Sequence, residues 1–176
     1  MKTEISGVTI ELRQGDIAQQ ADCEAVVNAA NAKLETGGGV AGAIHRAAGP
    51  GLADEARPLG PLKPGEAVIT GAHLLPNNYV IHCLGPVYGK DKPAGPLLAS
   101  CYSRALDLAE QEKVTSIAFP AISTGIFGYP VEEAGMIAFT TILEEIPRLK
   151  YVTRIVYVLY STEDLEMHKH MFAQLL

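Results

Sequence analysis

The sequence predicts an α/β domain in which helices cover both faces of a mixed sheet of about six strands. Short apolar runs alternate along the chain with segments of helical periodicity. One pair of runs is joined by a connection too short to hold a helix, so these two strands are antiparallel. A chain of 176 residues fits one domain and buries roughly 70 % of its unfolded surface without a disulfide or metal. We therefore expect residues 1–176 to form one domain.

The expected strands are the short apolar runs. The first alternates apolar and polar side chains, whereas the second is apolar without alternation, as in a parallel strand covered on both faces. The third and fourth meet through the turn at residues 76–78, which makes them antiparallel neighbours. The six expected strands are residues 8–12, 25–27, 65–71, 79–83, 116–122 and 154–160.

The expected helices lie between these runs. Asp16 is placed to cap a short helix after the first strand. A second short helix interrupts the Gly- and Pro-rich segment 50–64, which we interpret as a surface excursion. The longer helices begin at Val40, cover residues 97–113 and 131–146, and start again at Thr162. Strands and helices therefore alternate along the chain.

The charge distribution limits the possible partners. The net charge is -6, and no basic run is longer than His45–Arg46. A nucleic acid or an acidic membrane is therefore not expected as a partner. A small anion would have to be bound by local backbone N–H groups and helix ends.

The cysteines and the apolar segments indicate the compartment. Cys23, Cys83 and Cys101 are widely spaced in apolar surroundings, as is typical of buried thiols in a reducing cytosol. No stretch has the length of a membrane span, and the first residues lack the apolar core of a signal peptide. We expect a soluble, cytoplasmic, monomeric protein.

Two glycine-rich turns lead from a strand into a helix. In residues 25–49, Asn28 and Asn31 follow the strand, and three successive glycines precede the helix. In residues 117–130, a second apolar strand leads into a turn that contains Ser123 and Gly125. Bare backbone N–H groups at a helix start suit a phosphate or pyrophosphate. Because ligands of open α/β sheets bind beyond the carboxyl ends of the strands, both turns should face one crevice and hold a diphosphate.

Four motifs together resemble the macrodomain family, whose members bind ADP-ribose. They are GDI at residues 15–17, VVNAAN at 26–31, GGGVAGAIHRAAG at 37–49 and STGIFGYP at 123–130. They follow the order of the family and span nearly the whole chain. The resemblance implies a three-layer α/β/α sandwich. It also implies ADP-ribose, or an ADP-ribosylated protein, as the ligand.

The resemblance also implies roles for single residues. Asp16 would accept a hydrogen bond from the adenine amino group, Ile17 would pack beside the base, and Tyr160 would lie against it. Asn31 would bind the ribose farther from adenine. Asn28 is counted among the substrate-binding residues, in a role that braces the turn. The walls around the diphosphate and this ribose would be Gly38, Gly39, Val40, Ser123, Thr124, Gly125, Ile126 and Phe127.

Structural roles remain open for several of these residues. Asp16 and Asn31 could simply cap a helix or a turn. The glycines could serve close packing, and the aromatic rings of Phe127 and Tyr160 could belong to the core. The role of Glu35 is open, and His45 is expected to be a packed residue rather than a base.

The sequence offers no metal site, cofactor motif or catalytic triad. The histidines are isolated or lie on different helix faces, and neither HExxH nor CxxC occurs. The Ser123 turn is not a G-x-S-x-G elbow. We therefore expect no metal or cofactor, and we expect water as the nucleophile of any hydrolysis.

The chain departs from part of the family at Ala41. One hydrolytic branch of macrodomains carries an aspartate at this position, directly after the GGV turn. We expect weak hydrolysis of ADP-ribosyl esters, either on acidic side chains or in O-acetyl-ADP-ribose, with Asn31 as the catalytic residue. The alternative is a reader that binds ADP-ribose without turnover. A nucleotide phosphatase or a dinucleotide-dependent oxidoreductase is disfavoured, because GGGV is not G-x-G-x-x-G.

Overall fold

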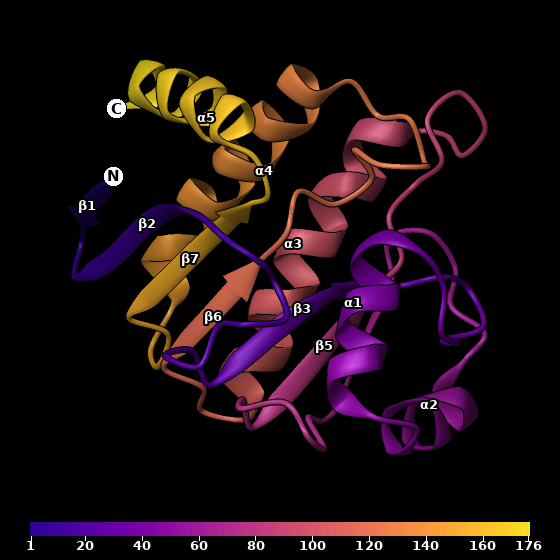
Figure 1. Ribbon diagram of the computed structural model, residues 1–176. Coiled ribbons are helices and arrows are strands. Elements are labelled where there is room, and N and C mark those ends of the chain that lie inside the picture. The colour runs from indigo at the N-terminus through magenta and orange to yellow at the C-terminus, as the bar shows by residue number, and fades with distance from the viewer.

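The computed structural model describes all 176 residues and contains one seven-stranded sheet with five α-helices (Figure 1). The strands are β1 (Lys2–Ile5), β2 (Val8–Gln14), β3 (Ala25–Ala29), β4 (Ala67–Gly71), β5 (Tyr79–Cys83), β6 (Ser116–Phe119) and β7 (Arg154–Leu159). The α-helices are α1 (Gly39–Ala48), α2 (Gly51–Ala56), α3 (Ala94–Gln111), α4 (Val131–Glu145) and α5 (Thr162–Leu175). Two single 3₁₀ turns, η1 (Arg57–Leu59) and η2 (Ile146–Arg148), follow α2 and α4.

The sheet is mixed, as predicted. Its strand order is β1-β2-β7-β6-β3-β5-β4. The five inner strands are parallel, whereas β1 and β4 pair antiparallel at the two edges. The antiparallel pairing predicted for residues 65–71 and 79–83 is therefore confirmed. Because parallel strands end at the same edge, the carboxyl ends of β2, β7, β6 and β3 lie side by side.

Helices cover both faces of the sheet, as also predicted. The larger core cluster joins α3, α4 and α5 to one face through side chains such as Val27, Ile155 and Tyr157. The smaller cluster joins α1 and α2 to the other face through Val26 and Val156. Neighbouring residues of one strand point to opposite faces, so β3 and β7 are apolar without alternation. Figure 1 shows α1 and α2 together on one side of the sheet.

The structure corrects two expectations near the N-terminus. The sheet has seven strands rather than about six, because β1 adds a short edge strand whose side chains are all exposed or half-buried. The helix expected after Asp16 is absent. Residues 16–19 form a turn instead, in which Asp16 Oδ1 accepts the backbone N–H of Ala18 at 2.9 Å. Asp16 therefore has the capping-type bond without the helix.

Element boundaries also differ where proline intervenes. Strand β6 ends at Phe119, earlier than residue 122, because Pro120 has no N–H for the sheet ladder. Helix α3 begins at Ala94 rather than at residue 97. Pro96 is tolerated there, since the first turn of a helix leaves its N–H groups without partners. All three cysteines are buried thiols, as expected. No helix combines the length and the apolar character needed to cross a bilayer.

Candidate functional site

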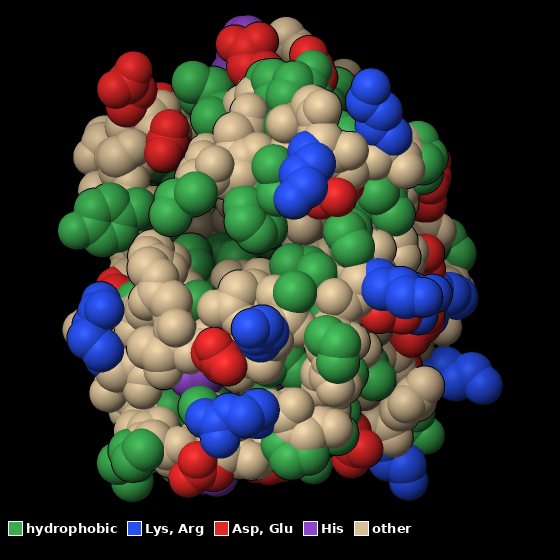
Figure 2. Space-filling view, turned by 90° about the vertical axis from the view of Figure 1, so that its right-hand side faces the viewer, with side chains coloured by type: hydrophobic (Ala, Val, Ile, Leu, Met, Phe, Trp, Pro, Cys, Tyr) green, Lys and Arg blue, Asp and Glu red, His purple; other side chains and the backbone are tan.

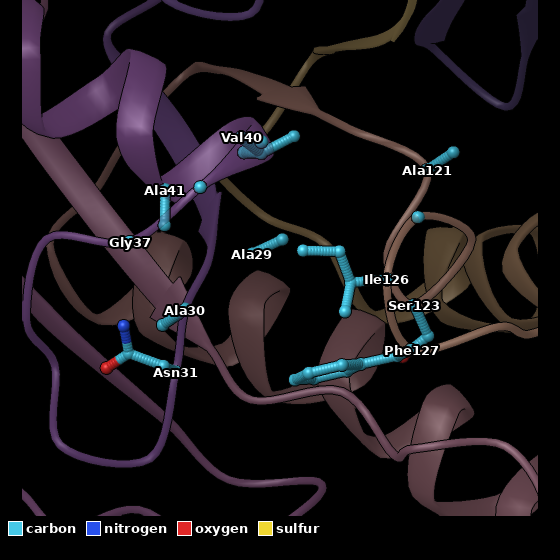
Figure 3. A pocket seen from close by; sticks show the side chains of 13 residues that line it. Ala29, Ala30, Asn31, Gly37, Val40, Ala41, Ala121, Ser123, Ile126 and Phe127 are labelled. Atoms are coloured by element: carbon cyan, nitrogen blue, oxygen red, sulfur yellow. The ribbon is translucent and has the colours of Figure 1, made fainter.

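A cleft of about 200 Å³ opens where β3 and β6 end. One wall is the first turn (residues 37–41), and the other belongs to the second turn (residues 120–129). Figure 3 shows the two turns on opposite sides of the cleft, with the end of β3 between them. The lining residues are Ala29, Ala30, Asn31, Gly37, Gly38, Gly39, Val40, Ala41, Ala121, Ser123, Gly125, Ile126 and Phe127. The prediction that both turns face one crevice is confirmed.

The first turn presents the start of α1 to the cleft. Gly38 is the N-cap and has no side chain to cap the helix, and no acidic residue stands in the first helical turn. The leading N–H groups of an α-helix have no partner within the helix. Together with the helix dipole, these groups favour a negatively charged ligand at this wall.

The second turn is held in a compact loop. Ser123 is buried and has a positive φ of 68°, which L residues rarely adopt. Its carbonyl accepts the N–H of Tyr129 at 2.9 Å, and the Gly125 carbonyl accepts the N–H of Gly128 at 3.0 Å. The Ser123 hydroxyl donates to the carbonyl of Pro86 at 2.8 Å. Its side chain therefore points to the connection between β5 and α3.

Ile126 extends from the second turn towards the first. Its side chain is 89 % exposed. Yet its Cδ1 lies 4.0 Å from the point where a Cβ on Gly38 would stand. Figure 3 shows this side chain projecting between the two walls. An exposed isoleucine in this position leaves apolar surface for a ligand to cover.

Asn31 lies at the end of the cleft where the chain leaves β3. Its Nδ2 donates to the carbonyl of Glu35 at 2.8 Å, and its Oδ1 accepts the N–H of Glu35 at 3.0 Å. The side chain thus closes the loop that leads to the first turn. One N–H and one lone pair of the amide remain for a ligand.

No carboxylate, imidazole or cationic side chain lines the cleft. A bound anion would therefore meet backbone N–H groups and small side chains. Figure 2 shows one face of the molecule, on which lysine and arginine side chains are scattered among acidic ones and form no single basic patch. The net charge of -6 works against an anion at long range. Local N–H groups must supply the attraction.

Eight of the thirteen predicted site residues line this cleft: Asn31, Gly38, Gly39, Val40, Ser123, Gly125, Ile126 and Phe127. Five further residues line the cleft, namely Ala29, Ala30, Gly37, Ala41 and Ala121. Gly37 and Ala41 belong to the glycine turn that the sequence already indicated, whereas the other three alanines were missed. The available signal for these alanines was their small size at or just after the strand ends. Phe127 also packs against a small core cluster, in agreement with the core role considered for its ring.

Asp16, Ile17 and Tyr160 lie outside the cleft but near one another. The N–H of Gly15 donates to the carbonyl of Leu159 at 2.9 Å, which joins the ends of β2 and β7. Asp16 and Tyr160 directly follow these two residues. Tyr160 is 84 % exposed, so the core role considered for its ring is wrong. The three residues gather at the same edge of the sheet as the cleft.

Two predicted site residues point elsewhere. Asn28 is 1 % exposed, and its Nδ2 contacts His82 Nδ1 at 3.1 Å. It therefore links β3 to β5 rather than bracing the turn or facing the cleft. The Thr124 hydroxyl donates to the carbonyl of Ala121 at 2.8 Å. Thr124 thus stabilises the second turn from within.

His82 connects Asn28 to the edge of the sheet. The Thr70 hydroxyl donates to the Gly71 carbonyl at 2.9 Å and lies 2.9 Å from His82 Nε2. Because this hydroxyl has one hydrogen, Nε2 must donate to it, and Nδ1 accepts from Asn28. Burial and the nearby His45 lower the pKa of His82 to about 3. His45 is itself buried, as expected, and burial lowers its pKa as well.

The neutral His82 predicts acid lability. Between pH 6.5 and 3 the unfolded chain binds a proton here that the folded chain does not. For His82 alone, the free energy of unfolding is undiminished above pH 6.5 and decreases as the pH is lowered from 6.5 to 3, by up to about 1.4 kcal/mol per pH unit. We expect free energies of unfolding measured with urea at pH 7, 6, 5 and 4 to show this slope. His82→Gln should make the slope shallower by the amount that corresponds to about one bound proton. The exposed His170 provides the control His170→Gln. Equal slopes for wild type and His82→Gln would contradict the assignment.

Comparisons with known proteins agree with this geometry. A family model described as Macro domain matches residues 27–138. A macro domain-containing protein of Chlorobaculum tepidum is 47 % identical over 151 residues, which cover 85 % of this chain and 88 % of that protein. A protein of Klebsiella pneumoniae named O-acetyl-ADP-ribose deacetylase is 43 % identical over 168 residues, 93 % of this chain and 95 % of that one.

A solved structure agrees with the fold. The Oceanobacillus iheyensis macrodomain with ADP superposes with a TM-score of 0.93 at 39 % identity, over 99 % of this chain and 95 % of that one. The family model covers more than half of the chain, and the α/β/α layers and both glycine turns are present. The chain therefore belongs to the macrodomain family.

Proposed function

We propose that the chain binds ADP-ribose in the cleft between the two turns. The observation that carries the proposal is that two glycine-rich turns, one of them at the uncapped start of α1, face one cleft without acidic side chains. The diphosphate would lie between the turns, where α1 offers its unpartnered N–H groups. The ADP bound to the Oceanobacillus iheyensis macrodomain supports a nucleotide diphosphate as the ligand.

The ends of β2 and β7 suit the adenine. Asp16 supplies a carboxylate for the amino group, although its Oδ1 already accepts the N–H of Ala18. Tyr160 offers an exposed ring on which the base can stack, and such stacking is worth about 1–3 kcal/mol in nucleic-acid binders. The adenine would thus lie beyond β7, and the distal ribose would lie near Asn31.

We also propose weak hydrolysis of ADP-ribosyl esters. The name of the Klebsiella pneumoniae relative supports this chemistry. No side chain of the cleft can serve as a general base. Water would therefore be positioned by Asn31, by the turns and by a phosphate oxygen of the substrate. Because a missing general base typically costs ~10²–10⁴ in rate, slow turnover is expected.

The absence of a titratable side chain from the cleft favours a second candidate, a reader that only binds ADP-ribose. Titration calorimetry with ADP-ribose tests binding in both cases, and no measurable heat at millimolar ligand would refute both. Mass spectrometry then distinguishes the hydrolase from the reader, with two substrates: O-acetyl-ADP-ribose and an automodified transferase, which carries ADP-ribose on its own side chains. If ADP-ribose or acetate is released from these substrates no faster than in the enzyme-free control, even at stoichiometric protein, only the reader function remains.

Asn31→Ala tests the place of the distal ribose. The variant removes the remaining polar atoms of the amide as well as both bonds to Glu35. We expect about a tenfold loss of affinity for ADP-ribose and a smaller loss for ADP, which lacks this ribose. Calorimetry with both ligands measures the difference. Equal losses would mean that Asn31 only shapes the loop.

A further inference from the structure

The connection between β5 and α3 contacts the second turn at both of its ends. We propose that residues 85–88 of this connection hold the second turn in the position that binds the diphosphate, and that Ser123 is a positioning residue rather than a direct ligand. This inference rests on the proposed function. It refines the expectation that Ser123 forms part of the binding wall, because it assigns the Ser123 hydroxyl to Pro86 rather than to the ligand.

The Ser123 hydroxyl already forms a hydrogen bond within the protein. It is buried and donates to the Pro86 carbonyl at 2.8 Å. A serine hydroxyl has one hydrogen, and ionised diphosphate oxygens only accept hydrogen bonds. While it bonds to Pro86, this hydroxyl therefore has no hydrogen to offer a phosphate. The bond instead fixes the position of the Ser123 backbone.

Gly85 makes this close approach possible. A Cβ at position 85 would lie 2.1 Å from Ser123 Oγ and 2.7 Å from Ile122 Cγ2. Such distances lie well inside van der Waals contact, so any side chain at position 85 would push the turn away. Ser123 has little freedom to yield, since its φ of 68° already lies in a region that L residues rarely adopt.

The far end of the turn is attached to the same connection. The N–H of Tyr88 donates to the carbonyl of Phe127, which lines the cleft, at 2.8 Å. The Tyr88 ring packs on Tyr129 with a centroid separation of 4.8 Å. Tyr129 in turn donates its N–H to the Ser123 carbonyl at 2.9 Å. Residues 85–88 therefore clamp both the start and the end of the loop that carries Gly125 and Ile126.

A third support fixes the chain just before the turn. The Tyr102 hydroxyl of α3 donates to the Pro120 carbonyl at 3.3 Å and accepts the N–H of Ile122 at 3.2 Å. It thereby provides hydrogen-bond partners for backbone groups that follow β6 and no longer pair within the sheet. The turn is thus held from the connection and from α3, and its walls are positioned before a ligand arrives.

The test compares Ser123→Ala and Gly85→Ala with Gly95→Ala as the matched control. A Cβ at position 95, in the first turn of α3, meets no atom closer than 3.7 Å. Dissociation constants for ADP and for adenosine are measured by NMR titration, and folding is checked by thermal unfolding. Adenosine lacks the diphosphate but shares the adenine contacts.

We expect Gly85→Ala to weaken ADP binding by between about tenfold and a hundredfold, Ser123→Ala by less, and Gly95→Ala by less than about twofold. Adenosine binding should stay near the wild-type value in all three, so the preference for ADP over adenosine falls. Ser123→Ala adds no atom, so it keeps the test decisive if Gly85→Ala does not fold.

If the wild-type protein binds ADP, either of two outcomes would overturn this inference and leave the proposed function intact. One is ADP affinity of Ser123→Ala within about twofold of wild type. The other is an equal loss for ADP and adenosine, which would indicate general damage to the domain. A wild-type chain that binds neither ligand would instead refute the proposed function itself, and this inference with it.

Discussion

Replacing Gly42 by alanine is expected to weaken ADP-ribose binding by about tenfold to a hundredfold while the domain stays folded. A Cβ at position 42 of α1 would lie 2.5 Å from the carbonyl oxygen of Gly37 and 2.9 Å from Arg46 Nη1. The arginine end can move aside. The Gly37 carbonyl belongs to the backbone of the first turn, so the turn itself must shift and the wall of the cleft moves with it.

Helix propensity alone predicts a different result. Alanine is favoured over glycine within a helix by about 1 kcal/mol. If local propensity dominated, Gly42→Ala would raise the unfolding temperature and leave the binding of ADP-ribose unchanged. The close contact predicts instead that affinity is lost while the gain in stability is reduced or cancelled by strain.

Calorimetry with ADP-ribose and thermal unfolding decide between these outcomes. Gly95→Ala is again the control, because position 95 is helical and has room for a methyl group. It should keep wild-type affinity. An affinity of Gly42→Ala within about twofold of wild type would show that the first turn adapts freely, and that its observed shape does not determine binding.

The two glycine turns could be predicted because their signals are local. An apolar run, a cluster of glycines and a helical pattern follow one another in residues 25–49. The rule that parallel strands place their carboxyl ends at one edge then brings both turns together. The layers follow in the same way, since β3 and β7 are apolar on both faces.

Side-chain roles depended on partners that are distant in the sequence. The partner of Ser123 is Pro86, 37 residues earlier. The partner of Asn28 is His82, 54 residues later. The sequence predicted Ser123 in the wall of the binding site and Asn28 as a brace of the turn, because an isolated sequence does not reveal which hydrogen bonds the fold has already made. Strand β1 was missed for a similar reason, since its identity comes from pairing with β2 rather than from an apolar pattern.

Ala41→Asp is expected to raise the rate of ester hydrolysis by about 10²-fold or more. Ala41 lines the cleft and lies in the first helical turn of α1, which now contains no acidic residue. A carboxylate there would lie beside the proposed ribose and diphosphate and could accept a proton from the attacking water. The helix dipole tolerates the new charge, because an acidic side chain in the first turn is typically stabilising by about 0.3–1 kcal/mol.

The same charge should weaken substrate binding. A carboxylate beside the N–H groups of α1 repels a diphosphate and competes with it for them, so KM should rise together with kcat. Ala41→Asn is the matched control, since it has nearly the same shape and no base. Both variants are measured by mass spectrometry, with O-acetyl-ADP-ribose and with an automodified transferase as substrates.

The two variants together separate the candidate roles of this cleft. If aspartate accelerates hydrolysis and asparagine does not, the wild-type cleft already orients water correctly and lacks only a base. The rate of the aspartate variant should then fall as the pH is lowered through the pKa of the new carboxyl group. If neither variant exceeds the wild-type rate, the turns hold ADP-ribose without placing a water against the ester, which would assign the chain a reading role.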